Sequence, residues 1–85
     1  MSNVVIIDVR TRAEFSGGHV AGSKNIPLQE IPERLEEIKA IEKPIVLCCA
    51  SGMRSANATQ YLKNQGIDCS NGGSWLSVNS LNLTT

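Results

Sequence analysis

The sequence predicts an α/β fold in which strands and helices alternate along the chain. Residues 4–9 and 45–48 form two short apolar runs without polar–apolar alternation, which is typical of strands buried on both faces of a parallel sheet. Segments with helical periodicity lie between these runs and after the second one. We therefore expect mainly parallel strands joined by helices.

The amino-terminal part is expected to contribute the first strand and then irregular structure. The run over residues 4–9 is rich in β-branched residues and is interrupted only by Asp8, which predicts a central strand. Residues 11–15 suit one helical turn, which the pair of glycines at 17–18 would end. Residues 19–27 are expected to be mostly extended.

An amphipathic helix is predicted over residues 28–38. Its apolar positions recur at spacings of three or four, and they are Leu28, Ile31, Leu35 and Ile38. Pro32 is acceptable in the first turn of such a helix. The pair Lys43-Pro44 would close this region and introduce the strand over residues 45–48.

The remaining part of the chain is expected to add a helix, a strand and a final turn. Residues 54–65 predict a helix, with Gly66 at the position of a C-terminal cap. Residues 67–70 are a candidate third strand, residues 71–73 a turn, and residues 74–76 the start of a last short helix.

Length and composition indicate one small globular domain over residues 1–85, of which residues 78–85 are expected to be a loosely held tail. Eight basic residues balance eight acidic ones without clustering, so no electrostatic footprint for nucleic acid or anionic membranes is expected. Three cysteines are too few for a disulfide framework. A single histidine and no Cys or His cluster predict no metal site.

The amino terminus lacks the basic region, apolar segment and cleavage site of a signal peptide, so we expect a cytoplasmic protein. Free cysteines fit that reducing compartment. A mature exported form with an added initiator methionine stays open as the alternative.

Cys49 is the strongest candidate for a reactive residue. It follows the strand over residues 45–48, and a short loop containing Gly52 leads from it into the next helix. In a strand–loop–helix arrangement, consecutive backbone N–H groups can converge on an anion. Such surroundings can lower a cysteine pKa from ~8.5 to roughly 3.5–7.5. A persulfide on this sulfur would also be anionic and would use the same donors.

The loop from Cys49 to Ser55 resembles the active-site loop of rhodaneses, with glycine three residues and arginine five residues after the cysteine. Further similarities cover nearly the whole sequence: Asp8-Val9-Arg10, Glu14-Phe15, Gly18-His19-Val20-Ala21-Gly22-Ser23, Asn25-Ile26-Pro27 and Gly72-Gly73-Ser74-Trp75. Within the family the chain is most similar to the small phage-shock type, whose domain likewise begins almost directly at the Asp-Val-Arg strand.

This resemblance implies a small rhodanese-like three-layer domain, with a mainly parallel sheet of about four or five strands flanked by helices. It also implies thiosulfate sulfurtransferase activity without a cofactor. The partners would be thiosulfate or a protein persulfide as donor, and a thiophilic acceptor such as cyanide or a thiol. Many relatives carry an extra leading strand and helix, and without them one sheet edge is less covered. A weak dimer therefore stays open beside the expected monomer.

Cys49 is the expected nucleophile, and the residues that follow it are expected to bind the substrate: Ala50, Ser51, Gly52, Met53, Arg54 and Ser55. Arg54 would either hold the loop or bind the oxygens of thiosulfate and sulfite, because a guanidinium presents a planar fork of donors. Ser51 and Ser55 could donate hydroxyl groups to the anion. Serines near a helix start also act as caps, so both roles stay open.

Other chemically notable residues are expected to be structural. Cys48 should project to the face opposite Cys49 and lie in the core, because side chains alternate along a strand. Arg10 is expected to form a local ion pair with Glu14 that fixes the turn. Structural roles are also expected for Asp8, His19, Cys69 and Trp75.

Two other functions stay open. Counted from Cys48, an arginine follows after five intervening residues, which is the spacing of cysteine-dependent phosphatases, some of which share the rhodanese fold. Counted from Cys49 the loop is shorter, whereas a phosphate needs a wider cradle than a sulfur atom, and no aspartate follows as an obvious general acid. The other alternative is a non-catalytic sulfur-delivery module, in which Cys49 accepts sulfur only from a protein partner.

Overall fold

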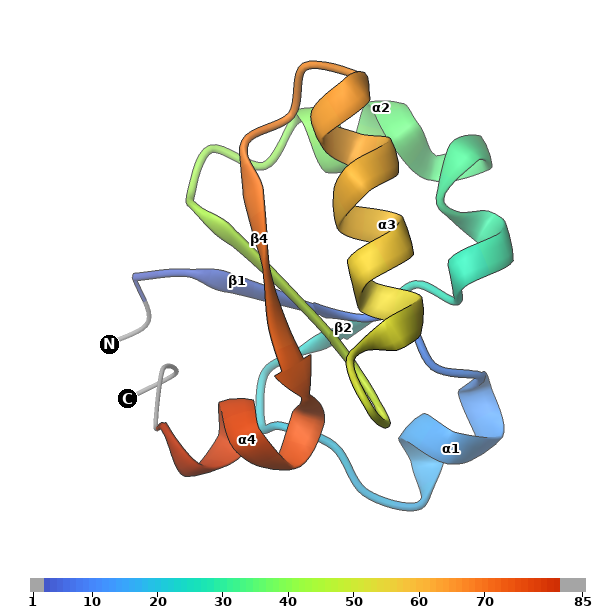
Figure 1. Cartoon of the computed structure of the whole chain (residues 1–85), viewed down its shortest axis with the longest axis vertical. Helices are drawn as coiled ribbons and strands as arrows, with labels where there is room; N and C mark the ends of the chain where they lie inside the picture. The colour runs from blue at the N-terminus through green and yellow to red at the C-terminus, as the bar shows by residue number, and fades with distance from the viewer. Residues whose placement is uncertain (1–2, 82–85) are drawn as a thin grey trace.

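The computed structural model describes residues 3–81, which form a four-stranded parallel sheet with helices on its faces (Figure 1). The elements are β1 (Val5–Asp8), α1 (Arg12–Ser16), β2 (Lys24–Asn25), η1 (Leu28–Glu30), η2 (Pro32–Arg34), α2 (Leu35–Lys39), β3 (Ile45–Cys49), α3 (Met53–Asn64), β4 (Cys69–Ser74) and α4 (Trp75–Ser80). The strand order is β2-β1-β3-β4, and each neighbouring pair is parallel. The predicted fold class is confirmed.

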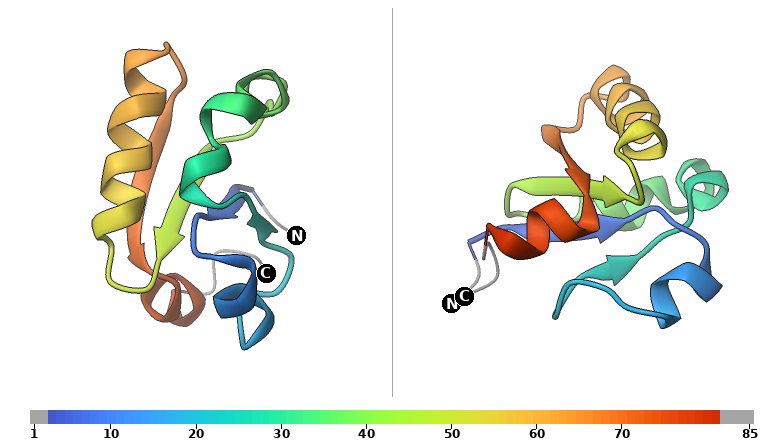
Figure 2. Two further views of the ribbon diagram at one scale, coloured as in Figure 1. Left: turned by 90° about the vertical axis from the view of Figure 1, so that its right-hand side faces the viewer. Right: turned by 60° about the horizontal axis from the view of Figure 1, so that its bottom comes forward.

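Helices α2 and α3 cover one face of the sheet, and α4 covers the other (Figure 2). The larger apolar core lies under α2 and α3 and joins Ile38 and Leu62 of these helices to Leu47 of β3. A smaller core on the opposite face joins Val78 of α4 to Ile6 of β1. The two central strands are therefore buried on both sides, which explains their continuous apolar sequences.

The predicted helix over residues 28–38 is broken into the short elements η1, η2 and α2. An α-helix starting at Leu28 would need an N–H from Pro32, which proline lacks. Tighter hydrogen bonds replace that pattern, such as the one from Ile31 N–H to the Leu28 carbonyl at 3.2 Å. The predicted apolar face of this segment is confirmed, because Ile31 and Ile38 are buried in the core.

Strand β4 runs through the segment 71–73, where the sequence predicts a turn. The central residue, Gly72, lies where α4 packs onto the sheet. A Cβ at this position would lie 2.6 Å from a methyl of Val78 and 2.7 Å from a methyl of Val46. Glycine is therefore needed for close packing, and it coincides with a shift in the pairing register between β3 and β4.

Helix α4 continues beyond the predicted last turn. The Ser74 hydroxyl caps it by accepting the N–H of Ser77 at 3.1 Å, and Val78 is fully buried. Residues 78–80 are therefore helical, and Val78 anchors them to the smaller core, while residues 82–85 of the predicted tail lie outside the described residues. Across residues 3–81, the helices lack the length and apolar character needed to cross a membrane.

Candidate active site

Strand β3 brings two adjacent cysteines to the carboxyl edge of the sheet and points them to opposite faces. Cys48 lies in the smaller core, whereas Cys49 lies in the larger core on the α3 side. Both residues are 0% exposed. Burial, assisted by the charge of Asp8, raises the pKa of Cys48 to about 12. The predicted core position of Cys48 is confirmed.

Hydrogen-bond donors of the loop and of α3 converge on the sulfur of Cys49. The N–H of Gly52 lies 3.0 Å from Sγ, and the N–H and the hydroxyl oxygen of Ser55 each lie 3.4 Å from it. Cys49 is the last residue of β3 and not the first loop residue, so only residues 50–52 separate the strand from α3. The predicted convergence of loop and helix N–H groups is present.

Gly52 makes this tight loop possible. Its φ of 102° is in the left-handed region, which glycine tolerates and other residues rarely adopt. An added Cβ would also lie 3.2 Å from the Cα of Gly73 in β4. Both the backbone conformation and the close approach of β4 therefore require glycine beside the sulfur.

The surroundings of Cys49 favour its thiolate. Burial is the largest single influence and opposes ionisation, but the hydrogen bonds together outweigh it and lower the pKa of Cys49 to about 7. The hydroxyl and N–H of Ser55 contribute first, followed by the N–H groups of Gly52 and Ser51. A large fraction of this cysteine is therefore nucleophilic near neutral pH.

The other side chains of the predicted binding loop lie at the surface. Ala50 and Ser51 are exposed, and 76% of Met53 is exposed on the first turn of α3. The structure therefore brings the backbone of Gly52 and both donors of Ser55 to the sulfur, while these three side chains surround the loop.

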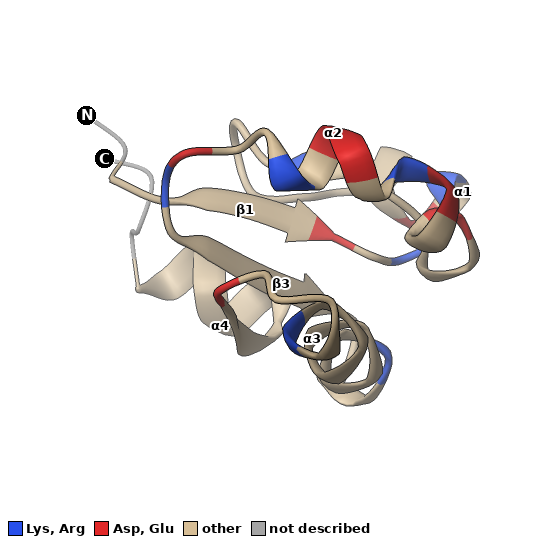
Figure 3. Ribbon diagram, turned by 90° about the horizontal axis from the view of Figure 1, so that it is seen from above, with Lys and Arg blue, Asp and Glu red and all other residues tan. Residues whose placement is uncertain are grey.

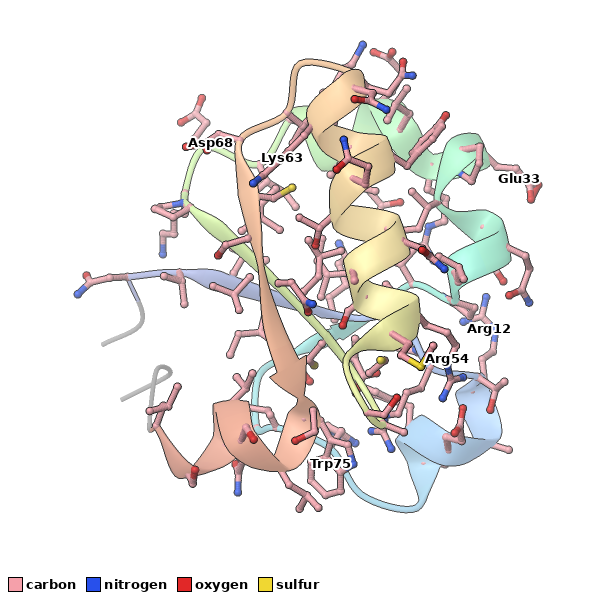
Figure 4. The ribbon with its side chains drawn as sticks, in the orientation of Figure 1. Arg12, Glu33, Arg54, Lys63, Asp68 and Trp75 are labelled. Carbon is pink, nitrogen blue, oxygen red and sulfur yellow. The ribbon has the colours of Figure 1, made fainter. Side chains whose placement is uncertain are left out.

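Arg54 forms a bidentate ion pair with Glu14 of α1. Its Nη1 and Nη2 atoms lie 2.8 and 3.0 Å from the two carboxylate oxygens, and Figure 4 shows the arginine between α3 and α1. The guanidinium, with a further hydrogen bond from Thr11 N–H, lowers the pKa of Glu14 to about 2. This contact favours the loop-holding role of Arg54, because it ties the start of α3 to a second element.

A buried ion pair braces the end of β1. Arg10 Nη2 lies 2.7 Å from the Asp8 carboxylate and donates to the Gly18 carbonyl at 2.7 Å, while its guanidinium lies 4.8 Å from the centre of the Trp75 ring. The predicted ion pair between Arg10 and Glu14 is wrong, because Arg10 reaches only the backbone carbonyl of that residue, at 3.2 Å. Arg10 pairs with Asp8 instead, because the carboxylate of Asp8, two residues earlier in the chain, lies within reach of the guanidinium.

His19 and Cys69 make local packing contacts that fit their predicted structural roles. His19 Nδ1 lies 2.8 Å from the Phe15 carbonyl oxygen, and the two rings stack with centroids 3.8 Å apart. Cys69 is buried, with its sulfur 3.7 Å from the Thr59 carbonyl oxygen.

Asn71 is a site residue that sequence reasoning missed. From β4 its Nδ2 donates to the Gly52 carbonyl at 3.1 Å, while its Oδ1 accepts the Ser55 hydroxyl at 2.7 Å and the Gly73 N–H at 3.0 Å. An asparagine followed by two glycines signals a turn. The contact with Gly52 spans 19 residues of sequence and depends on the pairing of β4 with β3.

Charges around the site are largely paired. Figure 3 shows acidic and basic residues close together on α1 and α2. In the same region Arg34 bridges to Glu30 and Glu37, and the pairing of Arg54 with Glu14 neutralises a cation near the loop.

Residues 1–76 match the family described as Rhodanese-like domain. An uncharacterized Bacillus subtilis protein, YqhL, is 44% identical over 61 residues, which cover 72% of this chain and 48% of that protein. The thiosulfate sulfurtransferase GlpE of Shewanella oneidensis is 33% identical over 66 residues, which cover 78% of this chain and 64% of that protein. The chain thus spans about half to two thirds of the length of these relatives.

Among solved structures, a rhodanese with anions from E. coli superposes with a TM-score of 0.77 at 29% identity, covering 87% of this chain and 89% of that one.

Proposed function

The chain belongs to the rhodanese-like domain family, and we propose that it is a sulfurtransferase that carries sulfane sulfur as a persulfide on Cys49. Its donor is thiosulfate or another persulfide, and its acceptor is a thiophile such as cyanide or a thiol. The observation that carries this proposal is the convergence of the Gly52 and Ser55 donors on the Cys49 sulfur. A thiolate and a persulfide are both anionic, so one set of donors serves both states.

The reaction consists of two displacements at sulfur. In the first, the Cys49 thiolate attacks the outer sulfur of thiosulfate, a new S–S bond forms, and the old S–S bond breaks with its electron pair leaving on sulfite. In the second, cyanide attacks the outer sulfur of the persulfide, thiocyanate leaves, and the thiolate is regenerated. Each step exchanges one anion for another, so no proton is transferred and ping-pong kinetics follow.

Access to the sulfur requires a local movement. Cys49 is 0% exposed, so a donor reaches Sγ only after the loop over residues 50–52 or a side chain beside it shifts. The short loop and its exposed residues are the part of the site best able to move.

A sulfur-delivery module is the second candidate. The pairing of Arg54 with Glu14 supports it, because an arginine already held by a carboxylate is a weaker anchor for the oxygens of thiosulfate. In this alternative Cys49 receives sulfur only from the persulfide of a protein partner and not from thiosulfate.

The position of Cys48 argues against a phosphatase. Cys48 is the nucleophile that the longer phosphatase spacing would require, yet it lies on the opposite face of β3 and burial raises its pKa to about 12. A buried neutral thiol is a poor nucleophile.

Intact-mass measurement after incubation with thiosulfate tests the proposal. Wild type and Cys48→Ala should each gain one sulfur, and Cys49→Ser should gain none. A coupled assay with thiosulfate and cyanide should then produce thiocyanate with wild type and Cys48→Ala only.

Other donors separate the alternatives. Labelling of Cys49 by the persulfide of a sulfurated carrier protein, but by neither thiosulfate nor glutathione persulfide, would select the delivery module. Sulfur retained in Cys49→Ser, or no labelling of wild type by any of these three donors, would exclude Cys49 as the carrier.

A further inference from the structure

The amide of Asn71 has only one orientation that fits its three partners. Gly73 N–H is a donor 3.0 Å from Oδ1, and the Gly52 carbonyl is an acceptor 3.1 Å from Nδ2. Exchanging the two ends of the amide would place a donor against a donor and an acceptor against an acceptor. The atom of Asn71 that faces the Ser55 hydroxyl is therefore an oxygen that can only accept.

The Ser55 hydroxyl has a single hydrogen and three possible acceptors. Asn71 Oδ1 lies at 2.7 Å, the Gly52 carbonyl at 3.2 Å and the Cys49 sulfur at 3.4 Å. The Gly52 carbonyl already accepts from Ala56 N–H and Asn71 Nδ2, which uses its two lone pairs. Asn71 and the sulfur therefore compete for this hydrogen. The Asn71 oxygen is the nearer acceptor, and donation to the sulfur is the bond that helps to lower the pKa of Cys49.

The position of that hydrogen matters for the nucleophile. While Ser55 donates to Asn71, its oxygen presents lone pairs to Cys49, which suits a protonated thiol that donates to Ser55. A thiolate or a persulfide needs the opposite arrangement, with the hydroxyl hydrogen turned to the sulfur. Hydrogen bonds to a charged partner are the stronger kind, so this choice affects the reactivity of the sulfur.

We propose that Asn71 is a positioning residue that restrains the reactivity of Cys49 by competing with its sulfur for the one hydroxyl proton of Ser55. The inference rests on Cys49 being the nucleophile of the proposed function. It does not depend on which compound donates sulfur.

Few charged groups lie close enough to confuse the effect. The titratable groups of the described residues that act on Cys49 or on its neighbour Cys48 are Arg54 of α3 with its partner Glu14 of α1, the ion pair of Asp8 and Arg10 after β1, and the neutral thiol of Cys48 itself. Substitution of Asn71 by alanine alters none of these charges.

The test measures the rate of Cys49 alkylation by iodoacetamide against pH, with the modified residue identified by fragmentation mass spectrometry. Asn71→Ala should lower the apparent pKa of Cys49 by about half to one pH unit, because the Ser55 proton is released to the sulfur. Asn71→Asp keeps an acceptor and adds a negative charge, so it should raise the pKa. Asn57→Ala, on the exposed surface of α3, is the matched control and should leave the profile unchanged.

A double-mutant cycle separates competition for the proton from simple support of the loop. In a Ser55→Ala background, Asn71→Ala should no longer shift the profile, because the shared hydroxyl is gone. A shift of equal size in that background, or a raised pKa in Asn71→Ala itself, would overturn the proposal. Both measurements need no sulfur donor, so they stand whether or not thiosulfate labels Cys49.

Discussion

Replacing Gly52 with alanine should change the reactivity of Cys49 more than the stability of the fold. Two costs arise at this position. The left-handed φ of 102° is disfavoured for alanine by ~1–2 kcal/mol, and the new Cβ would lie 3.2 Å from the backbone of Gly73. Strand β4 is held by its neighbours, so the loop is the part expected to move.

Movement of the loop takes the Gly52 N–H away from the Cys49 sulfur, which it now reaches at 3.0 Å. A hydrogen bond to a charged group contributes ~1.5–3 kcal/mol. At ~1.4 kcal/mol per pH unit, its loss should raise the pKa of Cys49 by about one to two units. The thiolate fraction at pH 7, and with it the rate of persulfide formation, should fall by a factor of about 5 to 50.

Gly66→Ala is the matched control. Gly66 has a comparable φ of 83°, but an added Cβ there meets nothing within 4 Å, and Gly66 follows the far end of α3. It should lose ~1–2 kcal/mol of stability from the same backbone strain while keeping the wild-type pH profile. Urea denaturation reports the first quantity and alkylation of Cys49 against pH the second. Identical pH profiles for Gly52→Ala and Gly66→Ala would falsify the role given to the Gly52 N–H.

Two further substitutions probe the contacts around the site. Glu14→Gln should be less stable than wild type above pH 4.5, and the difference should disappear as the pH falls from about 4.5 to about 2. The ion pair with Arg54 holds the pKa of Glu14 at about 2, so the carboxylate stabilises the folded state until it is protonated. Thermal melts over this pH range check it, and most of the difference should vanish in an Arg54→Ala background. Gly72→Ala should lower the free energy of unfolding by ~1–3 kcal/mol through overpacking against Val78 and Val46, measured by urea denaturation; a loss below ~0.5 kcal/mol would show that α4 can move aside.

Local patterns in the sequence were sufficient for the parts of the fold that depend on local burial. The apolar runs predicted β1 and β3, and alternation along a strand placed Cys48 and Cys49 on opposite faces. The convergence of donors on the Cys49 sulfur followed from the order strand, glycine-containing loop and helix. These features need only neighbouring residues to specify them.

Contacts between distant segments were not predictable in the same way. Arg54 and Glu14 are 40 residues apart and meet only because α1 and α3 are carried to the same edge of the sheet. The sequence around Gly72 predicted a turn. The reason for glycine at this position was hidden, because the two valines that exclude a side chain there belong to β3 and α4. The role of Asn71 likewise depends on the register of β4, which its own neighbours do not encode.

The alternation of Cys48 and Cys49 across β3 also determines how this protein tolerates peroxide. A disulfide between the two would require the strand to break, and Cys69 pairs with Ile45, four residues and ~13 Å from Cys49 along β3. Neither of the other two cysteines is therefore placed to resolve a sulfenic acid at Cys49. Such an acid proceeds to the irreversible sulfinic form unless a thiol from solution intercepts it, so repair of the nucleophile depends on the surrounding thiol pool.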